Sequence, residues 1–138
     1  MLYGTDAERR LVRSPDLDGP VEVLAEGPVG SIFAINHDGS RIVINRDYVF
    51  DGNTYVQVGH RIPMLWTSES GLQPLDVPFE DAWVTAASQD LRSFAGNNSH
   101  LVGEYPEYAT WSLTPSGLHT ISVNYPGTRP WNEPGTPT

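Results

Sequence analysis

Four histidines are the residues of this chain best suited to metal binding or to proton transfer near neutral pH. No two of them form an H-x-H or H-x-x-x-H pair, the spacings that place two imidazoles on one face of a strand or helix. They could still meet in space, but their positions favour structural roles at turns and strand ends. The four are His37, His60, His100 and His119.

Carboxylates offer two further kinds of chemistry, calcium binding and acid–base catalysis. Asp16 and Asp18 look like the opening of a calcium loop, which needs a glutamate at its twelfth position. That position is Gly27, and Pro20 interrupts the loop, so a specific calcium site is not expected. Glycosidase-type catalysis needs two carboxylates about 5 to 10 Å apart, and no spacing along one sequence establishes such a pair.

Motifs for nucleophilic catalysis and nucleotide binding are absent from the sequence. There is no G-x-S-x-G, and Ser116 in Pro-Ser-Gly is a turn residue. There is no G-x-G-x-x-G and no P-loop. The chain has no cysteine, which excludes disulfides, thiol chemistry and zinc sites built on sulfur. We therefore predict a non-enzymatic protein with no catalytic residue, no cofactor and no metal.

The charge balance limits the partners. Seventeen acidic residues against eight basic ones give a net charge of −9, which would repel a nucleic-acid backbone. No apolar run approaches the roughly 20 residues that span a bilayer, and the charged start lacks the order of a signal peptide. All eight basic residues are arginine, which favours a GC-rich source genome such as that of an actinobacterium or its phage.

The 138 residues suit one domain of ordinary size. Residues 1–15 hold few apolar side chains and are expected to form an N-terminal arm. Residues 16–126 are expected to form a single β-rich domain. Residues 127–138 contain three prolines and are expected to form a C-terminal tail, because proline cannot pair within an inner strand.

Turn residues between apolar segments predict three hairpins. The turns are residues 37–40 (HDGS), 51–54 (DGNT) and 114–117 (TPSG). One helix is expected at about residues 78–95, because Trp83, Ala87, Leu91 and Phe94 recur at helical spacing. The predicted fold is mainly β: an antiparallel β-sandwich or barrel with this one helix and extended termini.

The sequence of the last predicted hairpin resembles part of a known class of domain. Residues 109–125 (ATWSLTPSGLHTISVNY) look like the closing strands of immunoglobulin-like β-sandwich domains, filamin-type repeats included. The match covers under a fifth of the chain. It implies a scaffold with an adhesive or binding role, in which the helix would be an insertion.

Aromatic residues outside regular strands are candidates for a protein interface, because such side chains often anchor contacts. Trp66 and Tyr105 could equally fold back onto the core. Trp131 lies in the Pro-rich tail, where no core is expected to reach. The candidate interface residues are Trp66, Tyr105, Tyr108 and Trp131.

The layout of a compact β-domain with an arm and a tail favours a structural or assembly protein. The most concrete form is a bacteriophage virion component, a capsid decoration protein or a head–tail or tail subunit, that contacts itself or other virion proteins. It would be a homo-oligomer or lattice-bound, and located in the virion or, alternatively, in the bacterial cytoplasm. Two alternatives stay open: an acidic immunity or inhibitor protein that binds a basic toxin, and a small ligand-binding barrel or enzyme.

Overall fold

The computed structural model describes residues 1–50, 52–102 and 105–123. Within these ranges the chain forms β-structure and no helix. The described part accordingly contains no helix that could cross a membrane. The strands are β1 (Leu2–Thr5), β2 (Leu11–Ser14), β3 (Glu22–Ala25), β4 (Ser31–Ile35), β5 (Arg41–Phe50), β6 (Tyr55–Thr67), β7 (Gly71–Pro74), β8 (Ala82–Ala87), β9 (Phe94–Val102), β10 (Tyr105–Thr114) and β11 (Gly117–Val123).

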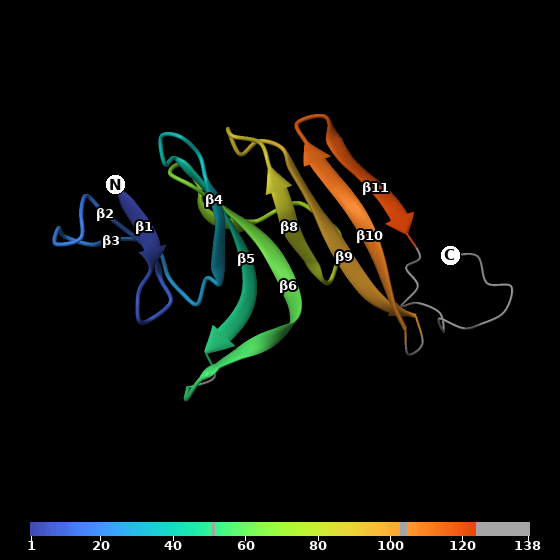
Figure 1. Ribbon diagram of the computed structural model, residues 1–138, viewed down its shortest axis with the longest axis horizontal. Helices are drawn as coiled ribbons and strands as arrows, with labels where there is room; N and C mark the ends of the chain where they lie inside the picture. Colours follow the sequence, from blue (N-terminus) through green and yellow to red (C-terminus); the bar gives the residue numbers. More distant parts are fainter. Residues whose placement is uncertain (51, 103–104, 124–138) are drawn as a thin grey trace, which may run out of the picture.

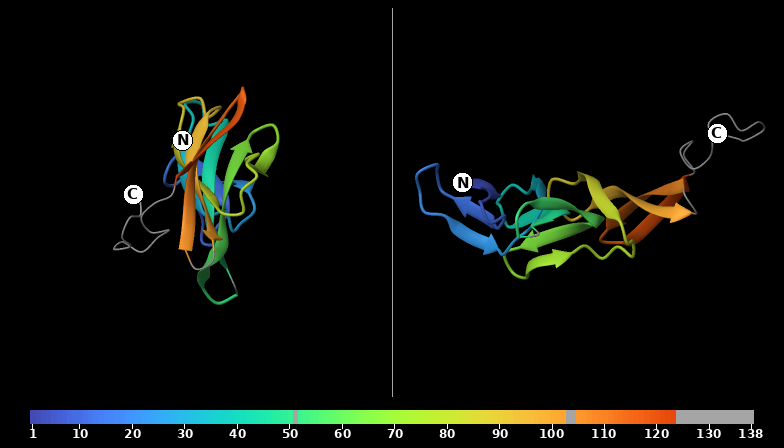
Figure 2. Two further views of the ribbon diagram at one scale, coloured as in Figure 1. Left: turned by 90° about the vertical axis from the view of Figure 1, so that its right-hand side faces the viewer. Right: turned by 90° about the horizontal axis from the view of Figure 1, so that it is seen from below.

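These strands form three sheets, each built from strands that follow one another in sequence (Figure 1). We call them the N-terminal sheet (β1, β2, β3), the central sheet (β4, β5, β6, β7) and the C-terminal sheet (β8, β9, β10, β11). All the strand pairs are antiparallel, so short turns suffice to connect neighbours. The sheets follow one another along the long axis of the molecule (Figure 2).

The three hairpins predicted from turn residues are confirmed. β4 and β5 flank a turn closed by hydrogen bonds from Gly39 N to Asn36 O and from Asn36 N to Arg41 O, both 3.1 Å. β5 pairs with β6 around the turn that contains Gly52, and β10 pairs with β11 across the turn that ends at Gly117. Each of these turn glycines has a positive φ, a conformation that costs other residues more.

The helix predicted over residues 78–95 is wrong. The same segment forms β8, a turn over residues 88–93 and the start of β9. Ser88 closes the turn twice: its N–H donates to Ser93 O at 2.9 Å, and its Oγ accepts from Ser93 N at 3.1 Å. Leu91 adopts a φ of 52° in this turn, and its side chain is 1% exposed.

The apolar spacing that favoured a helix has a different origin. In β8, Ala82 and Val84 are buried, and Trp83 between them points to the opposite face, which is the two-residue period of a strand. Leu91 reaches the same core from the turn. Pairing of β8 with β9 along its length supplies contacts between strands that outweigh local helix preference.

The first half of β5, in the middle of the central sheet, is buried on both faces. Ile42, Val43 and Ile44 are all 0% exposed, so consecutive side chains of β5 enter two different cores. Ile42 and Ile44 pack with Leu11 of the N-terminal sheet, while Val43 packs with Trp111 of the C-terminal sheet. A strand covered on both faces has a continuous apolar run rather than alternation. The layering is sandwich-like, in keeping with the predicted β-sandwich.

A side-chain amide joins the central sheet to the C-terminal sheet. Asn45 of β5 donates from Nδ2 to Val84 O at 3.0 Å, and its Oδ1 accepts from Val84 N at 2.9 Å. The bonds fall where the β8–β9 register shifts between Val84 and Ala86. Asn45 thus pairs with the backbone of β8 as a neighbouring strand would, and satisfies two groups at its edge.

Residues 1–15, expected to form an arm, hold β1 and β2, which pair with each other and with β3. Leu11 is 0% exposed within the core below this sheet. Trp66 of β6 is 5% exposed and donates from Nε1 to Leu24 O at 3.1 Å. Apolar packing and this hydrogen bond together fix the N-terminal sheet to the central sheet. The predicted tail, residues 127–138, lies outside the described residues.

Replacing Trp66 with phenylalanine is expected to loosen the N-terminal sheet while the other sheets stay folded. Phenylalanine keeps much of the apolar contact but cannot donate to Leu24 O, and losing a buried hydrogen bond of this kind costs about 1 kcal/mol. Amide hydrogen exchange should quicken in β2 and β3 and stay unchanged in β9 and β10. Equal protection of β2 and β3 in both proteins would contradict this role for the indole.

Candidate protein-interaction surface

The structure separates the aromatic residues predicted to form an interface. Trp66 is a core residue between the N-terminal and central sheets, so its prediction as an interface anchor is corrected to the alternative of folding onto the core. Tyr108 is half-buried in β10, in the C-terminal sheet. Tyr105 also belongs to β10, but its side chain is outside the described part, as is the whole of Trp131.

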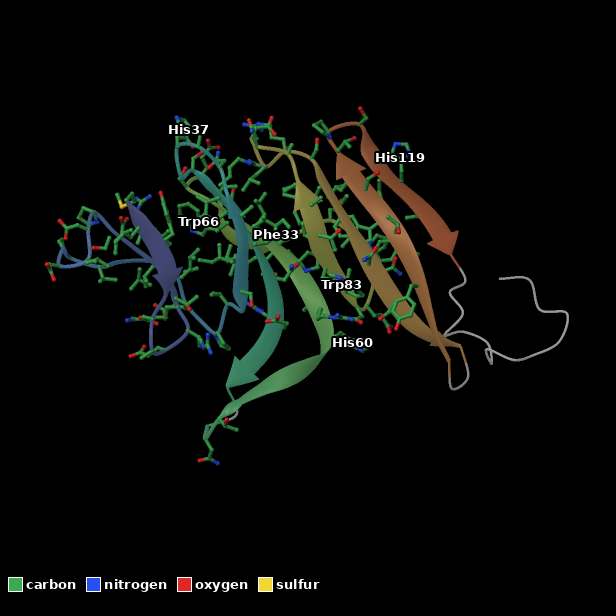
Figure 3. The ribbon with its side chains drawn as sticks, in the orientation of Figure 1. Phe33, His37, His60, Trp66, Trp83 and His119 are labelled. Atoms are coloured by element: carbon green, nitrogen blue, oxygen red, sulfur yellow. The ribbon has the colours of Figure 1, made fainter. Side chains whose placement is uncertain are left out.

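The histidines with described side chains do not converge. His37 lies in the turn between β4 and β5, His60 in β6 and His119 in β11, and each is exposed at a separate place (Figure 3). His100 is in β9, and its side chain is not described. Among the described residues, no group of three or more histidine, aspartate or glutamate side chains is placed to hold a metal ion.

Exposed apolar side chains gather on the N-terminal sheet and the loop between β2 and β3. Leu17 is 92% exposed, Met1 66% and Val21 61%. Among the side chains that the structure describes, the large exposed apolar ones outside this sheet and loop are Phe33, Ile35 and Ile62, at 37 to 41%. We call the following five residues the N-terminal apolar surface: Met1, Leu2, Leu17, Val21 and Val23.

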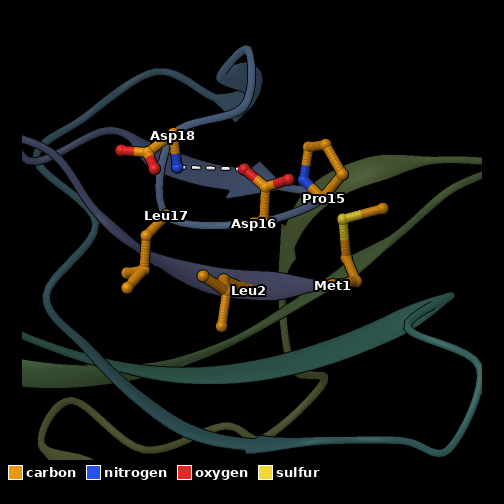
Figure 4. A pocket seen from close by; sticks show the side chains of 6 residues that line it. All are labelled: Met1, Leu2, Pro15, Asp16, Leu17 and Asp18. Atoms are coloured by element: carbon orange, nitrogen blue, oxygen red, sulfur yellow. Dashed lines mark hydrogen bonds between the residues drawn. The ribbon is translucent and has the colours of Figure 1, made fainter.

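An open hollow of about 530 Å³ lies on this surface. The start of β1 forms one side of it, and the beginning of the β2–β3 loop forms the other (Figure 4). Four of its lining residues are apolar and two are acidic. They are Met1, Leu2, Pro15, Leu17, Asp16 and Asp18.

The β2–β3 loop holds its shape through its own hydrogen bonds. Asp16 Oδ1 accepts from Asp18 N at 2.9 Å, and Asp16 O accepts from Ser14 Oγ at 2.6 Å and from Gly19 N at 3.4 Å. Asp16 therefore caps a tight turn rather than beginning a calcium loop. The turn directs Leu17 at its tip into solvent, where a leucine gains nothing from the fold of its own chain.

Two carboxylates that line the hollow form no ion pair with the described residues. Asp16 and Asp18 are exposed, and the described part of the chain places no arginine in an ion pair with either. By contrast, Glu22 of β3 accepts from Arg13 Nε at 2.7 Å, and this hydrogen bond lowers the pKa of Glu22. The hollow thus combines apolar side chains and two carboxylates in its lining.

A second polar cluster joins β6 to the C-terminal sheet and is structural. The Asp81 carboxylate accepts from Arg61 N (2.7 Å), Arg61 Nε (3.0 Å), Arg61 Nη2 (2.9 Å) and Ser99 Oγ (2.5 Å). The Arg61 guanidinium carbon lies 3.5 Å from the centroid of the Trp83 ring, a cation–π contact. We call these four residues, Arg61, Asp81, Trp83 and Ser99, the Asp81 cluster.

The Asp81 cluster keeps its carboxylate ionised. Burial by itself would raise the pKa of Asp81, but the hydrogen bonds from Arg61 and Ser99 outweigh it and lower the pKa to about 2. A carboxylate engaged by this many donors is a poor proton donor or acceptor for a substrate. Its role is to bind β6, β8 and β9 together.

Neither the Asp81 cluster nor the N-terminal apolar surface was predicted from the sequence. Arg61 and Asp81 are 20 positions apart, and no local pattern links a residue of β6 to the residue that precedes β8 in another sheet. The apolar surface did leave a signal, since Leu17 stands alone between two aspartates in a Pro-Asp-Leu-Asp-Gly turn. An apolar residue at a turn tip is a candidate for contact with another protein.

Comparisons with known proteins return no family model that matches the chain, and no curated protein or solved structure that matches it significantly. What the chain does must therefore be inferred from its own surface.

Proposed function

We propose that this chain is a non-enzymatic structural or assembly protein that acts through protein–protein contacts. The observation that carries the proposal is the gathering of exposed apolar side chains around the hollow on the N-terminal sheet. Single exposed apolar residues are ordinary on a protein surface, but a contiguous group marks a contact site. The most concrete form of the proposal is a bacteriophage virion component, a capsid decoration protein or a head–tail or tail subunit.

The energetics support a docking role for this surface. Full burial of one leucine side chain contributes about 2 kcal/mol, and Leu17, at 92% exposure, leaves nearly all of this unused. The neighbouring apolar residues would add to the gain if a partner covered them together. The surface lies at one end of an elongated molecule, which suits an end-on contact within a larger assembly (Figure 2).

The rest of the surface supports the same class. The described histidines lie apart, and the Asp81 carboxylate is engaged within the fold, so neither favours the alternative of a small enzyme or ligand-binding barrel. The partners would be proteins, either further copies or other virion proteins, with no nucleic acid and no membrane. The chain would then be a homo-oligomer or lattice-bound, and located in the virion.

A second candidate function has one observation in its favour. An acidic immunity or inhibitor protein that blocks a basic toxin in the bacterial cytoplasm would present carboxylates beside an apolar contact, as do Asp16 and Asp18, neither of which is in an ion pair with a described residue. Opposite charges on the two proteins would speed their association.

The virion proposal is tested by measuring the chain in purified particles. Phage particles from a culture that carries the gene are separated on a density gradient, and tryptic peptides of this chain are quantified by mass spectrometry. The expected result is a fixed ratio of this chain to the major capsid protein across the particle fractions. A chain that is abundant in the infected lysate and absent from the particles would contradict the virion proposal and leave the inhibitor as the better candidate.

A further inference from the structure

We propose that the hollow on the N-terminal sheet recognises a segment of another protein that carries an apolar side chain next to arginine or lysine. The inference rests on the proposed function, since it names the chemistry of the partner for a chain that acts through protein contacts. It applies equally to a virion partner and to a basic toxin, because both would meet the same surface.

The apolar half of the recognition follows from the lining of the hollow. Met1, Leu2 and Leu17 are 66%, 44% and 92% exposed and face one open space together with Pro15 (Figure 4). A volume of about 530 Å³ is enough to seat a large aliphatic or aromatic side chain. An apolar side chain of a partner that covered Met1, Leu2 and Leu17 would remove their exposed apolar surface from water, which is favourable.

The charged half follows from Asp16 and Asp18. Both carboxylates line the hollow, and no described arginine is paired with either of them. Arg13, on the same sheet, is already paired with Glu22, with 2.7 Å between Arg13 Nε and Glu22 Oε2. A cation from a partner would therefore find two carboxylate groups beside the apolar contact.

The same charges argue against symmetric pairing of two copies of this chain through the hollow. Symmetric pairing through this surface would bring the hollow of one copy against the hollow of the other, with Asp16 and Asp18 of both copies at one contact. Like charges held together in an interface cost free energy. A basic partner avoids this cost, and the net charge of −9 favours its approach.

The test uses the full-length chain and three synthetic peptides of equal length, alternating Arg-Leu, Arg-Ser and Glu-Leu. Binding is followed by the amide shifts in two-dimensional ¹H–¹⁵N NMR spectra at physiological salt. The Arg-Leu peptide is expected to shift amides of residues 1–5 and 14–23, while the other two peptides leave them unchanged. Leu17→Ser, and separately the pair Asp16→Asn with Asp18→Asn, should each weaken this binding by about tenfold.

Matched variants elsewhere keep the test specific. Ile62→Ser removes an exposed apolar side chain from β6, and Asp76→Asn removes an exposed carboxylate after β7; both should bind as wild type. If the Arg-Ser peptide bound as well as the Arg-Leu peptide, recognition of an apolar side chain would be overturned. If the Glu-Leu peptide bound as well, recognition of a cation would be overturned. Shifts confined to other residues, or no shifts at all, would overturn the whole inference.

The particle experiment and the peptide experiment test the virion function and this inference independently. A chain found in particles that ignores the Arg-Leu peptide would keep the virion function and lose this inference. A chain that binds the peptide through residues 14–23 and is absent from particles would keep the inference and lose the virion function.

Discussion

Replacing Gly96 with alanine is expected to lower the free energy of unfolding by about 3 kcal/mol, although only one methyl group is added. Gly96 lies in β9 opposite Val84 of β8 and Trp111 of β10. A Cβ at this position would overlap the carbonyl oxygen of Trp83 and would lie 2.6 Å from Cζ2 of Trp111. One of these neighbours is backbone and the other is a buried ring, so neither can move cheaply.

The Trp111 ring depends on this glycine. Its side chain is 1% exposed within the core between the central and C-terminal sheets, and its Nε1 donates to Asn97 O at 3.0 Å. The ring therefore lies across the backbone of β9 where Gly96 leaves room for it. An alanine would push the ring away from both its core contacts and its acceptor.

Urea denaturation followed by tryptophan fluorescence measures this effect, with Gly4→Ala as the matched control. Gly4 lies in β1, has no positive φ, and a Cβ there would meet no atom within 4 Å. Gly4→Ala should unfold close to wild type. Equal midpoints for the Gly96→Ala variant and wild type would show that β9 and the Trp111 ring do not pack as described.

Replacing Asp81 with asparagine is expected to lower the free energy of unfolding by about 2 kcal/mol near neutral pH. Asparagine is close to aspartate in shape and keeps an acceptor for Arg61 N. It cannot, however, form the charged pair with the Arg61 guanidinium, in which Nη2 lies 2.9 Å from Asp81 Oδ2. The arginine would stay stacked on Trp83 with its charge uncompensated.

The contribution of Asp81 to the free energy of unfolding depends on pH in a direction that follows from its pKa. The pKa of Asp81 in the folded chain is about 2, below the ordinary value of 3.8, so the unfolded chain binds this proton more readily. The stabilisation is fully present above the unfolded pKa of 3.8 and is lost as the pH falls through 3.8 towards 2. The two values differ by an amount that corresponds to about 2 kcal/mol.

The difference in stability between wild type and the Asp81→Asn variant should therefore shrink as the pH is lowered from 5 to 2. Measuring urea denaturation of both proteins across this range isolates Asp81 from the other carboxylates, which are common to both. Asp76→Asn, at an exposed position, serves as the control and should follow wild type throughout. A difference that stays constant with pH would mean that the Arg61 pair does not account for the stability of this cluster.

Much of the fold could be predicted from local sequence. The hairpins β4–β5, β5–β6 and β10–β11 could be predicted from their turn residues. Glycine at a positive φ, with aspartate or proline in the turn, reverses the chain without help from distant residues. The absence of a helix between Ala82 and Phe94 could not be predicted in the same way. There, the helix-like spacing of Trp83, Ala87, Leu91 and Phe94 is a local cue, while the contact of Asn45 with Val84 joins strands of two different sheets.

By itself, the sequence determined that the chain is acidic, free of cysteine, mainly β and built of hairpins, because composition and turn chemistry are properties of short stretches. Only the tertiary structure decided that Trp66 is a core residue and that Arg61 meets Asp81. It also decided that Leu17, Met1 and Leu2 share one hollow with two carboxylates. These contacts join residues that lie far apart in sequence. They depend on which face of each sheet is covered by the neighbouring sheet, and the packing between sheets decides this.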